Sequence, residues 1–464
     1  MNFDLAQIVR ATGGRLHPAT ARGSVAGVST DSRKIAPGEL FVALRGPNFD
    51  GHAFLGVAAA GEAAAALCER PVADLPIPQI EVGDSLRALG ELARAWRAQF
   101  ALPLVAVTGS SGKTTTKEML AAILAQTGPG LKTAGNLNNL VGLPLTLFAL
   151  KEADRWAVLE MGMSERGEIA RLAEIATPSV GIITNVGPAH LETLKTLEGV
   201  ARAKGELFIA LPPGGTAVIN ADDPRVAGLP VANGVRRLLF GASPQAEIRG
   251  EAVTVSGATV GFRLLLPQGT RSVTLQCAGR HNVANALAAA AAATALGVAP
   301  DLIVRGLETF RAGKGRMEVL LLDSDLLLLE DSYNANPLSM RAALVALDET
   351  VGGGGRRVAV LGDMLELGEG TAAMHYEIGV EAARRVDLLV VLGAQAEAVA
   401  AGARKGGLAA AQVLLPGSHE AAIELLRHEL RGGDRVLVKG SRGMRMERIS
   451  SALSGMSFPA GPGN

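Results

Sequence analysis

The heptapeptide Gly-Ser-Ser-Gly-Lys-Thr-Thr at residues 109–115 has the composition of a phosphate-binding loop. Its glycines let successive backbone N–H groups converge on phosphate oxygens, and the helix that follows attracts anions to its N-terminus. Lysine supplies a positive charge, and the threonine hydroxyl after it can reach a magnesium ion. We therefore predict a nucleotide-binding loop made by Gly109, Ser110, Ser111, Gly112, Lys113, Thr114 and Thr115. The first glycine of the strict motif falls on Val107, so a simple turn is the alternative.

Two further residues that can bind a cation follow other apolar runs. Glu160 closes the run at 156–160, and His190 comes a few residues after the run at 180–183. In an open parallel sheet the carboxyl ends of the strands converge where the ligand binds. An acid and an imidazole beside a phosphate loop suit a divalent cation that bridges phosphate and a second substrate. The alternatives are an ordinary strand-end acid and a loop histidine.

Three other polar residues lie in helical patterns. Lys204 follows His190 by 14 residues, and the sequence alone indicates a solvated residue on a helix face. Asn282 and Asn285 are three residues apart, so they share one face of a helix, where their amides could bind the edge of an adenine. The alternative is that Asn282 only caps the helix.

Polar and cationic residues also stand after apolar runs in the last third of the chain. Asp331 and Asn334 belong to the stretch Asp-Ser-Tyr-Asn-Ala-Asn-Pro at 331–337. Arg316 precedes this stretch, and Ser441 and Arg442 follow a later run. Cationic side chains above two facing sheets suit a polyanionic substrate, although each of them could be a simple surface charge.

The elements that position these residues follow from the periodicity of the chain. From about residue 103, short apolar runs at 103–109, 156–162 and 180–187 alternate with helical patterns at 113–126 and 166–176. Continuous apolar runs are typical of strands buried on both faces, and the alternation predicts a parallel sheet covered by helices. The alternation of apolar runs with helical patterns starts again near residue 317. Before residue 98, Gly and Pro separate shorter predicted strands.

The predicted fold class is therefore α/β with three domains. A chain of 464 residues exceeds one ordinary core. We expect a small N-terminal α/β domain at 1–98, a central parallel-sheet domain with the phosphate loop at 99–314, and a Rossmann-like C-terminal domain at 315–464.

Composition excludes several classes of function. The 45 basic and 45 acidic residues cancel, so nucleic-acid binding or membrane binding through bulk charge is not expected. Cys68 and Cys277 lie too far apart in the sequence for a thiolate metal motif, which favours a reducing cytoplasm. The N-terminus has no signal-peptide pattern, and the alanine-rich run at 283–299 predicts a buried helix rather than one inserted in a membrane.

The chain resembles the Mur ligases of peptidoglycan synthesis over nearly its whole length. The stretches TGSSGKTT, LEMG, ITNVGPAHLE, NADDP and GRHNVANALAA follow the order of that family. Within the family, STDSR, GNLNNLVGLPLTL and DSYNANP are similar to the branch that adds a D-alanyl-D-alanine dipeptide to a UDP-N-acetylmuramoyl-tripeptide. The ligase that attaches the third peptide residue usually carries Asp-Asn-Pro-Arg in its C-terminal domain, which this sequence lacks there.

The resemblance implies an ATP-dependent reaction through an acyl phosphate. The tripeptide carboxylate would attack the γ-phosphate of ATP, and the amine of D-alanyl-D-alanine would then displace phosphate. Because phosphorylation converts a poor acyl donor into one with a leaving group, the enzyme needs mainly in-line positioning and charge neutralisation.

The resemblance also implies roles for single residues. Lys113 would hold the β- and γ-phosphates, Thr114 and Glu160 one Mg²⁺ ion, and His190 a second. Lys204 falls where relatives carry a carbamylated lysine. The other implied contacts are Asn282 and Asn285 with adenine; Arg316, Asp331 and Asn334 with the nucleotide; Ser29, Thr30, Asp31, Ser32 and Arg33 with the uridine nucleotide; Asn138 and Asn139 with the muramoyl-peptide; and Ser441 and Arg442 with peptide carboxylates.

Other functions make different demands on the sequence. A folylpolyglutamate synthetase-like ligase shares the ATPase domain but lacks the uridine-binding domain. A P-loop GTPase would need a guanine-binding Asn-Lys-x-Asp, which is absent. A non-catalytic homologue would not need Lys113, Glu160 and His190. We expect a monomer that closes about the link at 311–316, and the sequence leaves open whether the third substrate residue is lysine or diaminopimelate.

Overall fold

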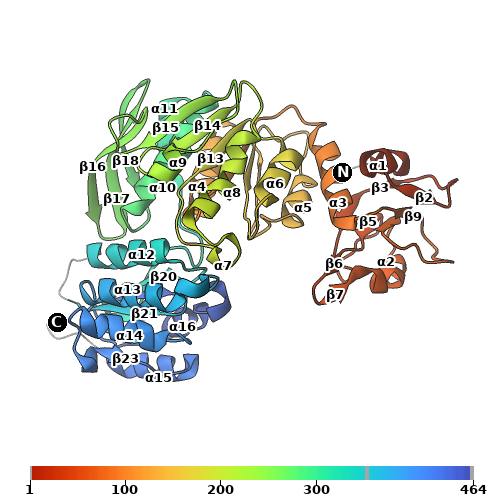
Figure 1. The fold of residues 1–464 in the computed structure, drawn as a ribbon. Coiled ribbons are helices and arrows are strands. Elements are labelled where there is room, and N and C mark those ends of the chain that lie inside the picture. The colour runs from red at the N-terminus through yellow and green to blue at the C-terminus, as the bar shows by residue number, and fades with distance from the viewer. Residues whose placement is uncertain (1–2, 351–354, 460–464) are drawn as a thin grey trace.

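The computed structural model describes residues 3–350 and 355–459. Three sheets of five, nine and six strands define three parts of the chain, called here the first, central and C-terminal units. Figure 1 shows the first unit on one side of the central unit, and the C-terminal unit packed beneath the central one. Among the described residues, no helix is both long and apolar enough to cross a membrane.

The first unit is a small sheet covered by helices. Its five strands pair in parallel except at one edge, where β2 is antiparallel to β9. In spatial order the strands are β2 (Arg15–His17), β9 (Gln79–Glu81), β8 (Ala65–Cys68), β5 (Glu39–Val42) and β4 (Gly27–Ser29). The other elements are β1 (Phe3–Asp4), β3 (Ser24–Val25), β6 (Arg45–Gly46), β7 (Phe49–Asp50), α1 (Leu5–Thr12), α2 (Leu55–Ala60) and α3 (Ser85–Arg97).

The central unit contains the predicted parallel sheet together with an extension that periodicity did not reveal. Its first seven strands pair in parallel, whereas β16, β17 and β18 form an antiparallel meander at one edge. The spatial order is β11 (Leu131–Lys132), β12 (Ala157–Glu160), β10 (Leu104–Thr108), β13 (Val180–Ile183), β14 (Thr216–Asn220), β15 (Arg236–Gly241), β16 (Ile248–Ser256), β17 (Thr259–Leu266) and β18 (Gly269–Leu275).

Helices cover both faces of this central sheet. The predicted alanine-rich helix is α10, whose small side chains pack fully buried beside α4 and the sheet. The helices are α4 (Lys113–Leu124), α5 (Gly142–Leu147), α6 (Glu168–Ala176), α7 (Leu191–Leu194), α8 (Leu197–Ile209), α9 (Pro224–Ala227), α10 (His281–Ala295) and α11 (Pro300–Thr309).

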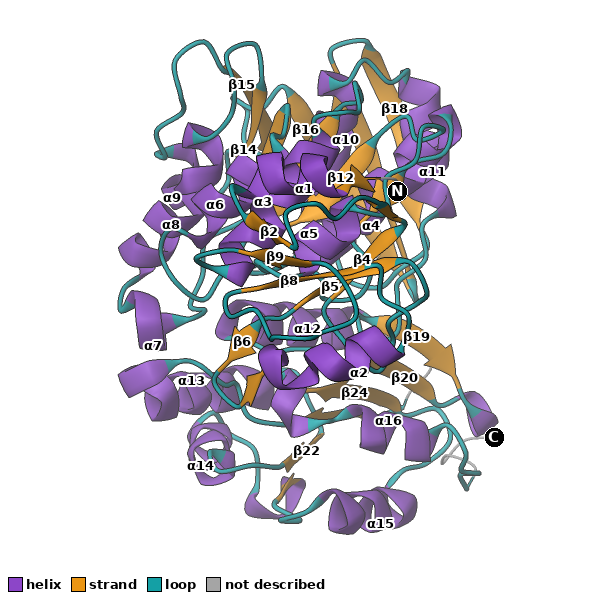
Figure 2. Cartoon of the chain, turned by 90° about the vertical axis from the view of Figure 1, so that its right-hand side faces the viewer, coloured by secondary structure: helices purple, strands orange, loops and turns teal. Residues whose placement is uncertain are grey.

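The C-terminal unit is a second α/β layer structure. All its strand pairs are parallel except β19 with β20. In spatial order the strands are β19 (Glu318–Leu321), β20 (Leu327–Asp331), β24 (Arg435–Lys439), β21 (Arg357–Leu361), β22 (Leu388–Val391) and β23 (Val413–Leu414). Its helices are α12 (Pro337–Glu349), α13 (Thr371–Ala383), α14 (Ala396–Lys405), α15 (His419–Glu429) and α16 (Glu447–Leu453). In both views α12 lies between the central unit and the rest of the C-terminal unit (Figures 1 and 2).

The structure also contains short 3₁₀ turns: η1 (Gly51–Phe54), η2 (Ala125–Thr127), η3 (Asp323–Asp325), η4 (Gly368–Gly370), η5 (Ala410–Gln412) and η6 (Arg442–Met444).

Candidate active site

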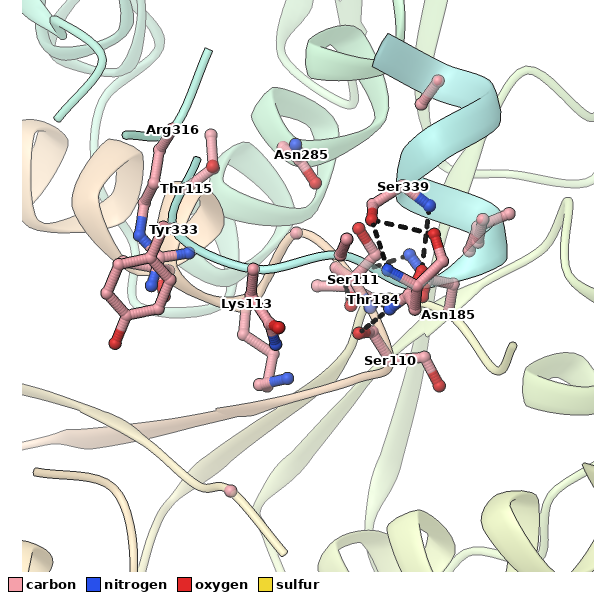
Figure 3. A pocket seen from close by; sticks show the side chains of 18 of the residues that line it. Ser110, Ser111, Lys113, Thr115, Thr184, Asn185, Asn285, Arg316, Tyr333 and Ser339 are labelled. Atoms are coloured by element: carbon pink, nitrogen blue, oxygen red, sulfur yellow. Dashed lines mark hydrogen bonds between the residues drawn. The ribbon is translucent and has the colours of Figure 1, made fainter. Parts of the chain in front are cut away.

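A cavity of about 970 Å³ lies between the central and C-terminal units. It is lined by the phosphate loop, by residues that follow β12, β13 and β14, by the start of α10, and by residues that follow β20 and β24. The carboxyl ends of strands from two sheets therefore meet at one cavity, as expected for ligand binding in α/β proteins. Figure 3 shows labelled side chains of both units around it.

The phosphate loop connects β10 to α4, and its shape depends on two glycines. Gly109 and Gly112 have φ of 151° and 78°, which side chains disfavour. A Cβ at Gly109 would lie 1.9 Å from Thr184 Oγ1, and one at Gly112 would lie 2.2 Å from Asn285 Oδ1. Close approach of the backbone to its surroundings therefore requires glycine here, and the N-terminus of α4 opens toward the cavity as a phosphate site does.

Lys113, the lysine of this loop, is the first residue of α4 and lines the cavity. Its Nζ donates a 2.8 Å hydrogen bond to the carbonyl oxygen of Gly109. Burial lowers the pKa of the Lys113 ammonium, while the negative charge of Glu160 opposes that shift. In a cavity wall, where the surroundings are less polar than bulk water, a cation attracts phosphate oxygens more strongly than it does in bulk solvent.

Thr114 and Glu160 lie together, as expected for two ligands of one cation. The Thr114 hydroxyl donates to Glu160 Oε2 over 2.6 Å, and Asn138 Nδ2 donates to Glu160 Oε1 over 2.8 Å. Among the described residues, no three His, Cys, Asp or Glu side chains gather as a ready-made metal site. One carboxylate and one hydroxyl nevertheless suit Mg²⁺, which typically takes few protein ligands and completes its shell with phosphate and water oxygens.

His190, the predicted ligand of a second cation, also lines the cavity. It precedes α7 with a left-handed backbone, φ 54°. Its Nδ1 lies 2.7 Å from Oε2 of Glu366, a residue of the C-terminal unit that the sequence analysis did not identify.

Lys204 is not the solvated residue that its helical pattern indicates. It lies on α8 with only 2% of its surface exposed, and it does not line the cavity. Burial, assisted by the nearby positive charge of Lys113, lowers the pKa of the Lys204 amine well below its usual value. The prediction of a surface lysine is therefore wrong, because the packing of α8 encloses the side chain.

Asn282 and Asn285 occupy the first two turns of α10, on the face toward the phosphate loop. Asn282 Nδ2 donates to the carbonyl oxygen of Ala278 over 2.8 Å, and Asn285 Nδ2 donates to Asn282 Oδ1 over 2.9 Å. The alternative that Asn282 caps α10 is wrong, since it is the second helical residue and its Oδ1 accepts from the Asn285 side chain rather than from a backbone N–H. Both residues line the cavity.

The C-terminal unit places its predicted nucleotide contacts on the opposite wall. The Arg316 guanidinium lies 3.8 Å above the ring of Tyr333, and Figure 3 shows the two side chains together. Asp331 Oδ2 accepts a 2.5 Å hydrogen bond from Lys439, whose Nζ also donates to the Asn334 carbonyl oxygen. Arg316, Asp331 and Asn334 all line the cavity, so the structure brings these residues to the phosphate loop.

The remaining predicted substrate contacts divide into two groups. Asn138, Asn139 and Arg442 line the cavity. Asn139 Oδ1 also accepts from the N–H of Gly142, the first residue of α5. Ser441 lies behind the cavity wall, because its buried hydroxyl accepts from the N–H of Leu365 and donates to a carbonyl oxygen.

The predicted uridine contacts at residues 29–33 lie outside this cavity, in the first unit. Ser29 ends β4, and Thr30 and Ser32 follow in the same loop. Asp31 accepts two side-chain hydrogen bonds from Arg33, of 2.8 and 2.9 Å. The Arg33 guanidinium lowers the pKa of Asp31 to about 2, so this carboxylate stays charged across the working range of pH.

Three further side chains bind the carbonyl groups of the phosphate loop, and the sequence did not predict these contacts. Thr184 and Asn185 donate to the Ser111 carbonyl oxygen, and Asn336 of the C-terminal unit donates to that of Ser110. Each contact joins segments more than 70 residues apart, for which a single sequence contains no local signal. Asn336 belongs to the stretch 331–337 that the sequence did single out.

Comparisons with known proteins agree with this architecture. Residues 24–97 match the family described as "Mur ligase family, catalytic domain", residues 107–293 match "Mur ligase middle domain", and residues 315–442 match "Mur ligase, glutamate ligase domain". The chain is 41% identical over 457 residues, 98% of each protein, to UDP-N-acetylmuramoyl-tripeptide–D-alanyl-D-alanine ligase of Escherichia coli. It is 36% identical over 453 residues, 97% of each protein, to the ligase of the same name from Bacillus subtilis.

Solved structures show the same likeness. A crystal structure of MurF from Acinetobacter baumannii superposes with a TM-score of 0.91 at 35% identity, covering 98% of this chain and 99% of that one. MurF ligase from Thermotoga maritima, in complex with ADP, superposes with a TM-score of 0.83 at 30% identity, covering 92% and 97% of the two chains. With its three sheets, its phosphate loop and these relatives, the chain belongs to the Mur ligase family.

Proposed function

We propose that this chain is an ATP-dependent ligase that joins D-alanyl-D-alanine to UDP-N-acetylmuramoyl-tripeptide in the synthesis of peptidoglycan precursors. The relatives that are 36–41% identical over nearly the whole chain bear the name of this activity. The observation that carries the proposal is the shared cavity, in which a phosphate loop and a hydroxyl–carboxylate pair face cationic residues of a second sheet. That arrangement suits the transfer of a phosphoryl group to an acid.

ATP would lie along the phosphate loop, with its phosphates on the N-terminus of α4 and beside Lys113. Backbone N–H groups at a helix N-terminus together with a lysine form a general triphosphate site. Asn282 and Asn285 would approach the adenine, and Arg316, Asp331 and Asn334 would contact the nucleotide from the opposite wall. The ADP complex of the related MurF supports a nucleotide in this fold.

Thr114 and Glu160 would hold one magnesium ion, and His190 a second. Bound there, the ions would neutralise charge on the phosphates and on the substrate carboxylate. Lys204 would take part through carbamylation, which turns its amine into a carboxylate. The reaction with CO₂ needs a neutral amine, and the burial of Lys204 favours that neutral form.

The reaction itself proceeds in two displacements. The tripeptide carboxylate oxygen attacks the γ-phosphorus of ATP, and the bond to ADP breaks to give an acyl phosphate. The amine of D-alanyl-D-alanine then attacks the acyl carbon, and the tetrahedral species collapses to an amide with loss of phosphate and a proton. The protein contributes mainly by holding the three reactants in line and by compensating charge.

The long substrate would be held at several points. Residues 29–33 of the first unit would bind the uridine nucleotide, and Asn138 and Asn139 the muramoyl-peptide. Ser441 and Arg442 are proposed for peptide carboxylates, and the Ser441 hydroxyl would then exchange its bonds to Leu365 and Ala335 for the substrate. Domain limits at residues 98 and 314, a monomeric chain and a cytoplasmic location, where ATP is available, belong to the same proposal.

Phosphate release from the purified chain tests this function. We expect ATP cleavage only when UDP-N-acetylmuramoyl-tripeptide and D-alanyl-D-alanine are both present, with stoichiometric amide product. Equal release with a folate and glutamate would instead support a folylpolyglutamate synthetase-like ligase and overturn the proposal. Parallel assays with lysine- and diaminopimelate-containing tripeptides determine which third residue the enzyme accepts.

A further inference from the structure

Three successive carbonyl groups of the phosphate loop accept hydrogen bonds from side chains. Lys113 Nζ donates to the Gly109 carbonyl oxygen over 2.8 Å, and Thr184 Oγ1 donates to that of Ser111 over 2.6 Å. Between them, the Ser110 carbonyl oxygen accepts a 3.0 Å hydrogen bond from Asn336 Nδ2. Asn336 is the one of these three donors that belongs to the C-terminal unit.

The Ser110–Ser111 peptide group is thereby fixed from both sides. Its carbonyl oxygen binds Asn336, and its N–H donates to Asn185 Oδ1 over 2.9 Å. The orientation of such peptide groups decides where the neighbouring loop N–H groups point, and those groups form the phosphate cradle. The C-terminal unit therefore contributes to the shape of a loop that lies wholly in the central unit.

Asn336 can make this contact because its own position is fixed. It is the N-cap of α12: its Oδ1 accepts from the N–H of Ser339 over 2.9 Å, and its own N–H donates to the Ser339 hydroxyl over 3.0 Å. Figure 3 shows Ser339 at the start of α12, close to Ser110 and Ser111. The single amide therefore uses its oxygen to cap the helix and its nitrogen to bind the loop.

The packing around this contact leaves little freedom. Ser110 Oγ donates to the Gly187 carbonyl oxygen and accepts from the Gly187 N–H. A Cβ built on Gly187 would lie 3.3 Å from Leu338 Cδ2, so α12 rests closely on this second loop as well. The start of α12 therefore sits on two loops of the central unit at once.

We propose that Asn336 is a positioning residue that couples the docking of the C-terminal unit to the affinity of the phosphate loop for nucleotide. The inference rests on the proposed binding of ATP at this loop. When α12 docks, Asn336 orients the Ser110 peptide group for phosphate, and bound nucleotide in turn favours the docked arrangement. Thermodynamic linkage requires that the two effects be equal in size.

Asn336→Ser separates the two uses of the amide. Serine is an equally good N-cap, but its shorter side chain has no second group that reaches Ser110. In calorimetric titrations with magnesium and a non-hydrolysable ATP analogue, we expect the Kd to rise about three- to tenfold, as for loss of one neutral hydrogen bond. X-ray scattering should also show a smaller contraction of this variant at saturating analogue, while its melting temperature stays close to that of the unmodified chain.

Ser339→Ala is the matched control. It removes the hydroxyl that binds the N–H of Asn336 but leaves the bond from Asn336 to Ser110 possible. We expect a lower melting temperature with unchanged affinity for the analogue. Asn336→Asp is a second test, because aspartate caps helices well yet turns an acceptor toward the Ser110 carbonyl. It should bind the analogue at least as weakly as Asn336→Ser.

The proposal is overturned if Asn336→Ser and Asn336→Asp bind the analogue as tightly as the unmodified chain. It is also overturned if Ser339→Ala weakens binding to the same extent, because the effect would then come from the helix cap. Failure of the proposed function is a different result: the unmodified chain would release phosphate without needing both substrates, or would bind no ATP analogue.

Discussion

His190 and Glu366 meet across the boundary between the central and C-terminal units, with Nδ1 and Oε2 2.7 Å apart. Both residues have a left-handed backbone, with φ of 54° and 63°, which costs a non-glycine residue roughly 1 kcal/mol or more. The hydrogen bond from His190 lowers the pKa of the Glu366 carboxyl. Because Nδ1 is occupied, Nε2 is the nitrogen that remains for a cation, in the carboxylate–histidine–metal order common in metalloenzymes.

Glu366→Gln should therefore weaken the second cation site proposed at His190. We expect the Mg²⁺ concentration at half-maximal phosphate release to rise about tenfold, because loss of such a carboxylate typically costs ten- to a hundredfold in metal affinity or activity. Mn²⁺ binding followed by electron paramagnetic resonance gives a readout that is independent of turnover. Glu369→Gln is the control, because it changes an exposed residue in the middle of η4, the turn that precedes α13. Equal Mg²⁺ dependence in both variants would remove Glu366 from this role.

Lys204→Ala tests the proposed carbamate. Removing the amine should reduce turnover at least about a hundredfold, since the proposed carbamate near Lys113 and its charge would be lost. Acetate or formate in the assay should restore part of the activity by supplying a small carboxylate. Mass spectrometry under native conditions should detect a CO₂ adduct on the unmodified chain that Lys204→Ala lacks. A variant with full turnover would show that this buried lysine only fills space.

Gly112→Ala should abolish nucleotide binding. The new methyl group would lie 2.2 Å from Asn285 Oδ1, on a backbone with φ of 78°. Relief of this overlap must move either the loop or an amide proposed to face the adenine. We expect turnover to fall about a hundredfold or more, because a loop shifted by an ångström loses its alignment with the substrate. Gly56→Ala is the control, since nothing lies within 4 Å of the Cβ position there. Tight binding of an ATP analogue by Gly112→Ala would contradict the assignment.

Asp387→Asn should alter the pH dependence of stability in the C-terminal unit. Asp387 accepts hydrogen bonds from the backbone and side chain of Arg357, and the side-chain bond is the main cause that lowers its pKa. A lowered carboxyl pKa contributes stability above the unfolded value near 3.9, and this contribution is lost as the pH falls through the folded value.

Because the Asp387 side chain is 40% exposed, screening keeps the expected loss at pH 7 to about 0.5–1 kcal/mol. Urea unfolding at pH 7 and below pH 3 provides the measurement: the difference from the unmodified chain should vanish in acid. Exposed Glu397, changed to glutamine, serves for comparison. A difference that does not shrink as the pH falls below the unfolded value would point to packing rather than to the ion pair.

The sequence predicted the parallel core and the phosphate loop because their signals are local. The runs at 103–109, 156–162 and 180–187 contain β10, β12 and β13, since strands buried on both faces must be continuously apolar. The meander β16–β18 escaped prediction because much of it is exposed and carries polar residues, so no continuous apolar run marks it.

The sequence did not predict the environment of those site residues whose burial and partners depend on tertiary contacts. Lys204 looks like a surface residue in its helix, and only the packing around α8 buries it. Asn282 looks like a helix cap until α10 is seen to begin one residue earlier. Glu366 and Asn336 act across a boundary between units, for which neither spacing nor composition provides a signal. Residues 29–33 were assigned to uridine binding in the first unit by resemblance alone, and that assignment stays a prediction.

The separation of the first unit from the cavity sets a minimum length for a substrate that binds to both. The lining of the cavity begins at Ser110, so none of the residues described in the first unit lines it. If residues 29–33 bind the sugar nucleotide as proposed, the substrate has to extend its free acid across the face of the central unit to reach the phosphate loop. A precursor whose peptide is one residue too short would bind at residues 29–33 without bringing its acid to the phosphate loop. The enzyme would then select substrates by length.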